Sequence, residues 1–138
     1  MNRKSLSEKI CNLVIDEENK ITLVDMETYG VTNNDNYKSG LYFLYNKLNE
    51  CIYVGKVGNG DTATLYMRMV GNGNASHRND PWHDEINFGY WHKFDLNEDD
   101  IETIERLAIL GMKQPIYNDK NTNQQTIDLI VKKLNLKE

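Results

Sequence analysis

Two short apolar runs in the middle of the chain have the length and composition of β-strands. They read "GLYFLY" (residues 40–45) and "CIYVGK" (51–56), and a polar stretch separates them. Short runs rich in aromatic and β-branched residues are typical of strands, and a brief polar connection joins two of them into an antiparallel hairpin. The pattern therefore predicts a β-hairpin between residues 40 and 56.

Outside the hairpin, the pattern predicts helices and further strands. Apolar residues spaced three or four apart, after a polar residue that can cap the first turn, are typical of helices. The helices are predicted at residues 5–15, 61–70, 97–112 and 126–136, and the strands at 21–25 and 87–96. Asp61 or Thr62 would cap the second helix, and Asn97 would cap the third.

The order of these elements predicts one small α/β domain. Between residues 38 and 119 the order is strand, strand, helix, strand, helix, which gives a three-stranded antiparallel sheet flanked by helices. A chain of 138 residues, 39% of them hydrophobic, suffices for a single core. An N-terminal extension over residues 1–37 and a C-terminal helix over residues 120–138 are too short to be independent domains. We expect both to pack on the core.

The hairpin predicts two different faces. If residues 46–49 form the loop, Tyr42 lies opposite Tyr53, and the two phenols share one face with Gly55. A glycine inside a strand leaves room for a close approach, so a ligand could sit beside the phenols. A cross-strand tyrosine pair that only packs is the alternative. The other face would be apolar core, made of Leu41, Phe43, Ile52 and Val54.

A carboxylate interrupts the apolar side of the helix predicted at 97–112. At about 100° per residue, Glu105 falls between Met112 and Ile109, inside the apolar arc. A buried carboxylate costs on the order of several kcal/mol unless it is paired or bound to a metal. One interpretation is an internal ion pair with Arg68, and the other is a ligand for a hard cation such as Mg²⁺. Both interpretations could hold together if a phosphate lay between a metal ion on Glu105 and the guanidinium of Arg68.

Charge and cysteine content narrow the partner and the compartment. The formal net charge of −5 argues against a broadly basic nucleic-acid surface. The acidic side chains are concentrated, however, because residues 94–105 hold six of them and no basic side chain. The hairpin region is mildly basic, so a local phosphate site stays compatible with the composition. Cys11 and Cys51 match no zinc or redox spacing, and no run approaches the roughly 20 apolar residues of a membrane span. With no secretory signal pattern either, we expect an intracellular, reducing, cytoplasmic protein without membrane association.

The tyrosine-glycine hairpin and the residues after it resemble the signature of the GIY-YIG nucleases. "GLY" at 40–42 and "YVG" at 53–55 are similar to the paired triplets of that family. The other family markers follow in order, at Lys56, Arg68, Glu105 and Asn118. The resemblance covers residues 38–119, nearly the whole catalytic module of the family, and it implies a GIY-YIG-like fold.

The resemblance implies a metal-dependent DNA endonuclease. Such an enzyme hydrolyses phosphodiester bonds with one metal ion per active site and leaves 5′-phosphate and 3′-hydroxyl ends. Glu105 would hold one Mg²⁺ or Mn²⁺ against the phosphate. Arg68 would bind the scissile phosphate through its fork of donors, and Lys56 would add positive charge.

The general base is less well defined by the resemblance. Many family members carry a histidine, or sometimes a tyrosine, one turn after the arginine, where this chain has Asn72. Tyr42 is expected to orient and deprotonate the attacking water, with Tyr53 fixing its geometry, and His77 could substitute or assist if its loop folds back. A tyrosinate at neutral pH costs ~4 kcal/mol unless nearby cations lower the phenol pKa. Asn118 would order the site by hydrogen bonding.

Other signals leave alternatives open. Arg78 is a further candidate for DNA contact, with a solvated loop arginine as the alternative. Aromatic residues that either stack on bases or pack in the core are Trp82, Tyr90 and Trp91. A nucleotide cofactor is not expected, because "GKVGNGDT" has its lysine before the glycines and a Walker loop has it after them. The alternative function is a catalytically inactive nucleic-acid-binding or scaffold module of the same fold. The oligomeric state stays open between monomer and homodimer.

Overall fold

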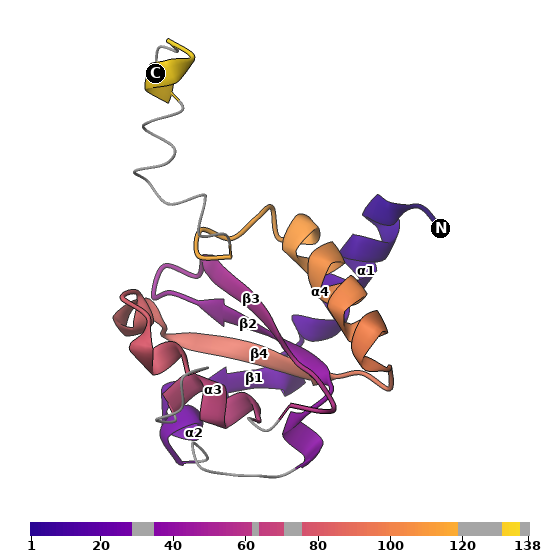
Figure 1. Cartoon of the computed structure of the whole chain (residues 1–138). Coiled ribbons are helices and arrows are strands. Elements are labelled where there is room, and N and C mark those ends of the chain that lie inside the picture. Colours follow the sequence, from indigo (N-terminus) through magenta and orange to yellow (C-terminus); the bar gives the residue numbers. More distant parts are fainter. Residues whose placement is uncertain (29–34, 62–63, 71–75, 119–130, 136–138) are drawn as a thin grey trace.

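A four-stranded antiparallel sheet forms the centre of the computed structural model (Figure 1). The structure describes residues 1–28, 35–61, 64–70, 76–118 and 131–135. The strands are β1 (Lys20–Thr22), β2 (Gly40–Tyr45), β3 (Cys51–Val57) and β4 (Phe88–Lys93), in the spatial order β1-β4-β2-β3. The predicted hairpin and the later strand are confirmed, but the prediction of three strands is wrong. β1 pairs with β4 and covers an edge that would otherwise expose unpaired backbone groups.

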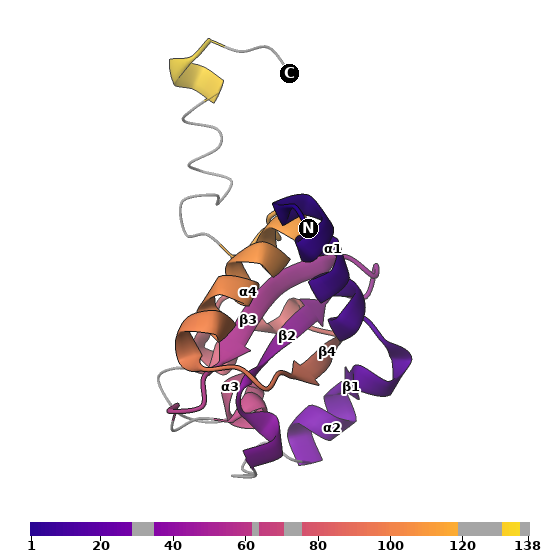
Figure 2. The ribbon, with the colours of Figure 1, turned by 90° about the vertical axis from the view of Figure 1, so that its right-hand side faces the viewer.

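Helices cover both faces of this sheet. They are α1 (Arg3–Val14), α2 (Leu23–Thr28), α3 (Leu65–Val70) and α4 (Glu98–Gly111), with short 3-10 turns at Glu17–Asn19, Asp35–Tyr37, His77–Asn79 and His83–Glu85. α1 and α4 lie side by side against one face, whereas α2 and α3 lie together on the other (Figure 1 and Figure 2). The architecture is therefore a mixed α/β fold, as the pattern predicts.

The longest helices follow the sequence pattern closely. The predictions at residues 5–15 and 97–112 correspond to α1 and α4. Asn97 caps α4 as expected, since its side-chain oxygen accepts a hydrogen bond of 2.9 Å from the backbone N–H of Asp100. Three acidic residues in the first turn of α4 further suit the positive end of its dipole.

The remaining helix predictions are met only in part. The helix predicted at 61–70 is shorter, because α3 begins at Leu65. The C-terminal helix predicted at 126–136 lies largely outside the described residues, of which 131–133 are helical.

The strand predicted at 21–25 ends early. The backbone N–H of Asp25 donates to the Thr22 hydroxyl over 3.1 Å, and the backbone N–H of Thr22 donates to the Asp25 carboxylate over 3.0 Å. Such a reciprocal pair begins a helix, because it satisfies N–H groups that have no partner inside the first turn. The spacing Thr-x-x-Asp is the sequence signal for this change from β1 to α2.

The pairing of β2 with β3 differs from the predicted register. Tyr42 faces Gly55 instead of Tyr53, and Tyr45 faces Cys51. The loop is one residue longer than predicted. Asn46 closes it, because its side-chain oxygen accepts hydrogen bonds from the backbone N–H groups of Leu48 and Glu50. A shift of two residues leaves side chains on their predicted faces, because the side-chain period of a strand is two.

A bulge produces one further difference. Leu44 faces Tyr53 and Tyr45 faces Cys51, so Ile52 is an extra residue in β3. The prediction that Ile52 shares a face with Val54 is therefore wrong. Ile52 packs with the cluster beneath α2 and α3, and Val54 packs with the cluster beneath α1 and α4.

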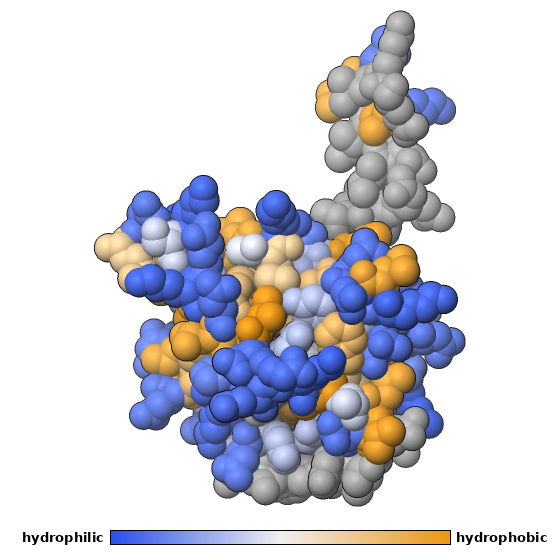
Figure 3. Space-filling model, turned by 180° about the vertical axis from the view of Figure 1, so that it is seen from behind, coloured by the Kyte–Doolittle hydropathy of each residue, from blue (hydrophilic) through white to orange (hydrophobic). Residues whose placement is uncertain are grey.

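The polarity of the surface and the state of the two cysteines relate to the compartment that the sequence predicts. From behind, the surface is mainly hydrophilic, with apolar residues in separate areas (Figure 3). Cys11 and Cys51 are unpaired thiols, and burial raises their pKa values to about 11 and about 12 respectively. Across the described residues, every helix is too short or too polar to cross a membrane.

Candidate active site

Two tyrosines lie on the sheet face that α3 covers. Tyr42 comes from β2 and Tyr53 from β3, and their ring centroids are 6.0 Å apart with planes tilted by 31°. The two rings are neighbours, as the hairpin pattern indicates, although they are not directly opposite in the register. Tyr53 stays partly exposed, whereas the Tyr42 side chain is only 1% exposed.

Gly55 makes room for the Tyr42 ring. A Cβ atom at Gly55 would overlap with the ring carbons and the hydroxyl oxygen of Tyr42. The prediction that Gly55 leaves room for a ligand is therefore wrong, because the phenol of Tyr42 already occupies that space. The glycine instead allows the ring to lie directly against β3.

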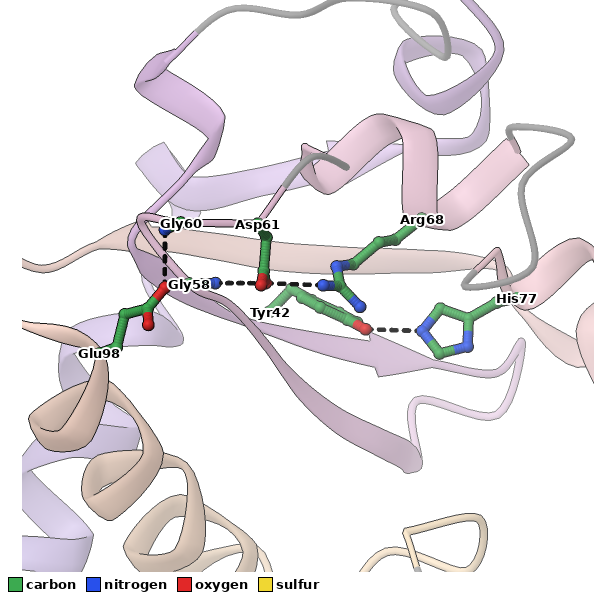
Figure 4. Close-up of polar contacts among 7 residues, drawn as sticks. All are labelled: Tyr42, Gly58, Gly60, Asp61, Arg68, His77 and Glu98. Carbon is green, nitrogen blue, oxygen red and sulfur yellow. Dashed lines mark hydrogen bonds and ion pairs between the residues drawn. The ribbon is translucent and has the colours of Figure 1, made fainter.

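A hydrogen-bonded chain connects Tyr42 to two residues that follow α3. The Tyr42 hydroxyl lies 2.6 Å from Nε2 of His77 (Figure 4). Nδ1 of His77 lies 2.8 Å from a carboxylate oxygen of Asp80. Although Asn72 lies outside the described residues, His77 thus comes to the tyrosine from further along the chain. His77 is expected from the sequence to substitute for Tyr42 or to assist it, whereas Asp80 is not predicted.

The Asp80 carboxylate defines the roles of the imidazole nitrogens. A carboxylate only accepts, so Nδ1–H of His77 donates to Asp80, and Nε2 is left to accept the hydroxyl of Tyr42. Burial lowers the pKa of His77, and the hydrogen bond to Asp80 opposes that shift. Burial also raises the pKa of Tyr42 well above its ordinary value, with Tyr53 adding to the effect. At rest the pair is therefore a neutral phenol donating to a neutral imidazole.

Arg68 reaches the same region from α3. Its Nη2 donates to the carboxylate of Asp61 over 2.7 Å, while its buried Nε has no hydrogen-bond partner among the described residues (Figure 4). Buried donors without a partner are rare in folded proteins. A guanidinium with one donor fixed and another unsatisfied is suited to donate to an oxyanion.

Asp61 is a second residue that the sequence analysis misses in this role. Predicted as a helix cap, it accepts instead from Arg68 and from the backbone N–H of Gly58 over 2.7 Å. Burial acts to raise the pKa of Asp61, but the bond from Gly58 and the charge of Arg68 together hold it below its ordinary value. Thr62, the other predicted cap, lies outside the described residues. Asp61 is therefore an anionic support for the guanidinium.

α4 anchors the loop that carries Asp61. The Glu98 carboxylate accepts a hydrogen bond of 2.7 Å from the backbone N–H of Gly60 (Figure 4). Glu98 lies in the first turn of α4, so the loop after β3 is tied to the helix that also carries Glu105. This tie connects the parts of the site that come from opposite faces of the sheet.

Glu105 lies half-buried on α4 without a direct partner. Among the described residues it makes no hydrogen bond or ion pair. Of the two interpretations, the ion pair with Arg68 does not form, and Arg68 binds Asp61 instead. Burial raises the pKa of Glu105, and the charge of Lys56 opposes that shift most strongly. The carboxylate thus lies within the electrostatic influence of Lys56 and Arg68, and it also raises the pKa values of Tyr42 and Tyr53.

This unpaired carboxylate fits a single hard cation. No group of three or more His, Cys, Asp and Glu side chains gathers in the described part of the chain. Mg²⁺ commonly uses one or two carboxylates and takes its other ligands from water and substrate phosphate. Glu105 has free oxygen atoms for that purpose, and positive charge from Lys56 lies near enough to help hold a phosphate.

Asn118 fastens the segment after α4 to the edge strand. Its Oδ1 accepts from the backbone N–H of Val54 over 2.7 Å, and its Nδ2 donates to the carbonyl of Val54 over 2.6 Å. The side-chain amide thus replaces a neighbouring strand at the open edge of β3. A supporting role by hydrogen bonding, as expected, agrees with this geometry.

The remaining candidates lie in different surroundings. Arg78 is exposed beside His77 in the same 3-10 turn. Trp91 is buried at 8% exposure in the core beneath α2 and α3, and Tyr90 packs edge-on against Tyr45. Trp82 is partly exposed and contacts the Tyr53 ring, with centroids 5.3 Å apart. Of the aromatic candidates, Trp82 is the one next to the site.

Comparison of the chain with protein-family models, curated proteins and solved structures gave no significant match.

Proposed function

We propose that this protein is a metal-dependent DNA endonuclease of the GIY-YIG type, which hydrolyses a phosphodiester bond to 5′-phosphate and 3′-hydroxyl ends. The observation that carries the proposal is the chain from Tyr42 through His77 to Asp80. It lies in the same electrostatic neighbourhood as Glu105 and Arg68. These groups supply a proton acceptor, a candidate metal ligand and a phosphate-binding cation.

The hydrogen-bonded chain gives the phenol a route to act as base. Tyr42 would pass its proton to Nε2 of His77 as it takes a proton from the attacking water. Asp80 would stabilise the imidazolium that forms, because its carboxylate already accepts from Nδ1–H. The charge of Arg68 favours the phenolate, which offsets part of the cost of ionising a phenol whose pKa burial raises.

The cations would hold the phosphate in line with that water. The accessible part of the Arg68 guanidinium, whose side chain is 20% exposed, would donate to a non-bridging oxygen, while Asp61 keeps the group in place. Glu105 would hold one Mg²⁺ or Mn²⁺ on the opposite side. When bound, that ion would supply charge neutralisation at the phosphate and at the leaving 3′-oxygen. The new bond joins water oxygen to phosphorus, and the bond to the 3′-oxygen breaks. That oxygen takes a proton from bulk water to become the 3′-hydroxyl, and His77 releases its proton to bulk water.

The decisive experiment uses supercoiled plasmid DNA with Mg²⁺ or Mn²⁺. The purified protein is expected to convert it to nicked circles, and chelation with EDTA should stop the reaction. Glu105→Gln should lose nicking while keeping the fold, as checked by circular dichroism. Nicking that survives in Glu105→Gln would contradict the metal role.

The inactive DNA-binding module remains the competing function. It is favoured if the wild-type protein and Glu105→Gln bind DNA equally in a gel-shift assay and neither cuts it with either metal. Analysis of the ends after nicking adds a separate check. A kinase should label 5′ ends only after phosphatase treatment if the products carry a 5′-phosphate.

A further inference from the structure

Three aromatic rings form a continuous stack beside the candidate active site. Trp82 stacks on Tyr53 with centroids 5.3 Å apart and planes inclined by 29°, and it stacks on Tyr117 with centroids 4.9 Å apart and planes inclined by 2°. Tyr117 stacks on Trp82 and Trp82 stacks on Tyr53, so the rings follow one another in the order Tyr53, Trp82, Tyr117.

The inner end of the stack reaches the proposed base. Tyr53 contacts the ring of Tyr42 and also that of His77, whose centroid lies 4.7 Å away. The ring centroid of Trp82 lies 5.2 Å from the centroid of the same imidazole. The stack therefore begins at the groups that would activate water and leads away from them.

The outer end of the stack is held rigidly and stays partly exposed. The backbone N–H of Tyr117 donates to the carbonyl of Ile52 over 3.1 Å, and its hydroxyl donates to the Glu85 carboxylate. The next residue, Asn118, clasps the backbone of Val54. Trp82 and Tyr117 are both partly exposed, unlike Trp91 in the core. A ring held in this way presents a flat surface at little further loss of conformational entropy.

The surroundings favour a base over a phosphate on this surface. Asp84 and Glu85 lie in the 3-10 turn beside the stack and carry negative charge. Such charges repel the sugar-phosphate backbone but do not oppose an uncharged aromatic ring. The cations Lys56 and Arg68 lie at the other end, near the proposed cleavage point. A nucleic acid would therefore place its phosphate on the cations and a base on the rings.

We infer that the outer face of Tyr117, the face turned away from Trp82, stacks an unpaired nucleobase of the DNA strand whose phosphate is cleaved. This inference rests on the proposed nuclease function and names its substrate class. Bases inside a duplex already stack on both sides, so the DNA must expose a base at this position, as single strands, branches and frayed ends do. The rings take any base, because each base has an aromatic face.

The test compares two oligonucleotides on a catalytically silenced protein. Glu105→Gln is titrated with a short, dye-labelled single strand and with a counterpart that carries abasic sites, and binding is read from fluorescence anisotropy. We expect the base-containing strand to bind more tightly. Adding Tyr117→Leu should weaken its binding by about 5- to 150-fold, since stacking contributes about 1–3 kcal/mol per base. The abasic strand should be nearly unaffected by that change.

Matched variants separate stacking from folding. Tyr117→Phe keeps the ring and loses the bond to Glu85, so it should bind like the parent protein. Phe94→Leu removes another partly exposed ring, one that contacts His92 away from the stack, and should also leave affinity unchanged. Melting curves of all variants show whether a loss of binding reflects unfolding.

The outcomes distinguish this inference from the proposed function. If the wild-type protein nicks plasmid, but both strands bind equally and Tyr117→Leu changes nothing, the stacking surface is overturned and the nuclease stands. If no DNA binds and no plasmid is cut, both fail. Selective loss of base-dependent affinity in Tyr117→Leu, with Tyr117→Phe intact, supports the stacking surface.

Discussion

The two faces of the central sheet are built from the same strands but differ in what they bury. Beneath α1 and α4, residues such as Phe43 and Val54 pack in an apolar cluster that also holds the phenol of Tyr45. Beneath α2 and α3, the buried phenol of Tyr42 is hydrogen-bonded to the imidazole of His77, and Arg68 lies there with a donor unsatisfied. Burial of titratable groups that are incompletely paired is unfavourable for folding.

If the proposed function holds, the face beneath α2 and α3 carries the proton-transfer groups, and the strands beneath α1 and α4 serve mainly stability. Apolar side chains contribute by removing area from water, and each position tolerates a similar residue. Tyr42, His77 and Asp80 instead depend on one another for hydrogen bonds, so a change in one affects all. Sites whose pKa values shift through burial and specific partners cluster at functional positions. Substitutions beneath α1 and α4 should therefore change mainly the stability, whereas substitutions of Tyr42, His77 or Asp80 should change mainly the nicking rate.

The largest effect on activity is expected from Glu105→Gln. Nicking should fall to background, because the amide is a poor ligand for a hard cation. The same change should stabilise the protein by about 0.5–2 kcal/mol, since it removes a half-buried charge that no donor satisfies. Chemical denaturation measures the second effect. Glu102→Gln, one turn earlier and paired with exposed Arg106, is the matched control and should change neither property much.

The pH dependence of that stability has a defined sign. Burial raises the pKa of Glu105 above its ordinary value of 4.5, so the folded state keeps the proton to higher pH than the unfolded state does. This contribution to stability is fully present below 4.5 and is lost as the pH rises through the raised value. The wild type should therefore lose this stability over that interval, relative to Glu105→Gln. Parallel curves across the interval would contradict the assignment.

The next largest effect is expected from Tyr42→Phe. Removing a general base typically slows a reaction by about 10²- to 10⁴-fold, and the nicking rate should fall within that range. Tyr45→Phe changes another buried tyrosine on the same strand, but one that packs beneath α1 and α4, and should cut at the wild-type rate. Equal activity of the two variants would remove Tyr42 from the mechanism.

Gly55→Ala should displace the Tyr42 ring from its place against β3. The added methyl group would overlap with the Tyr42 ring, so the ring must move, and the protein should lose about 1–3 kcal/mol of stability. Nicking should fall as well, because the hydroxyl then leaves Nε2 of His77. Val54→Ala on the opposite face should destabilise the fold but leave the rate of the folded enzyme intact. Comparing rates with melting temperatures separates the two variants.

The smallest expected effect concerns the pH profile of nicking. Burial lowers the pKa of His77, while Asp80 raises it again. His77 can accept the proton of Tyr42 only when it is neutral, so Asp80→Asn should lower its pKa and move the acid limb of the profile to lower pH. The maximal rate should also fall modestly, because the imidazolium loses a partner. An acid limb that moves to higher pH would argue against this role.

Prediction from the sequence works where the signal is local. The spacing of apolar residues and the cap at Asn97 are contained within one helix, so α1 and α4 are predicted closely. The register of the hairpin is not predicted correctly, because it depends on the five-residue loop closed by Asn46 and on the bulge at Ile52. Asp61 and Asp80 carry no pattern of their own, and each is defined by the side chain that it contacts.

By itself, the sequence determines the hairpin, the two long helices and the order of Tyr42, Tyr53, Lys56, Arg68 and Glu105 along them. Those features follow from periodicity and from residue type, which do not depend on distant parts of the chain. Only the tertiary structure decides that His77 meets Tyr42, that Asp61 and not Glu105 binds Arg68, and that Glu105 is left without a partner. Contacts between residues far apart in the sequence depend on how the layers pack, because a shift of a few ångströms would exchange one ion-pair partner for another.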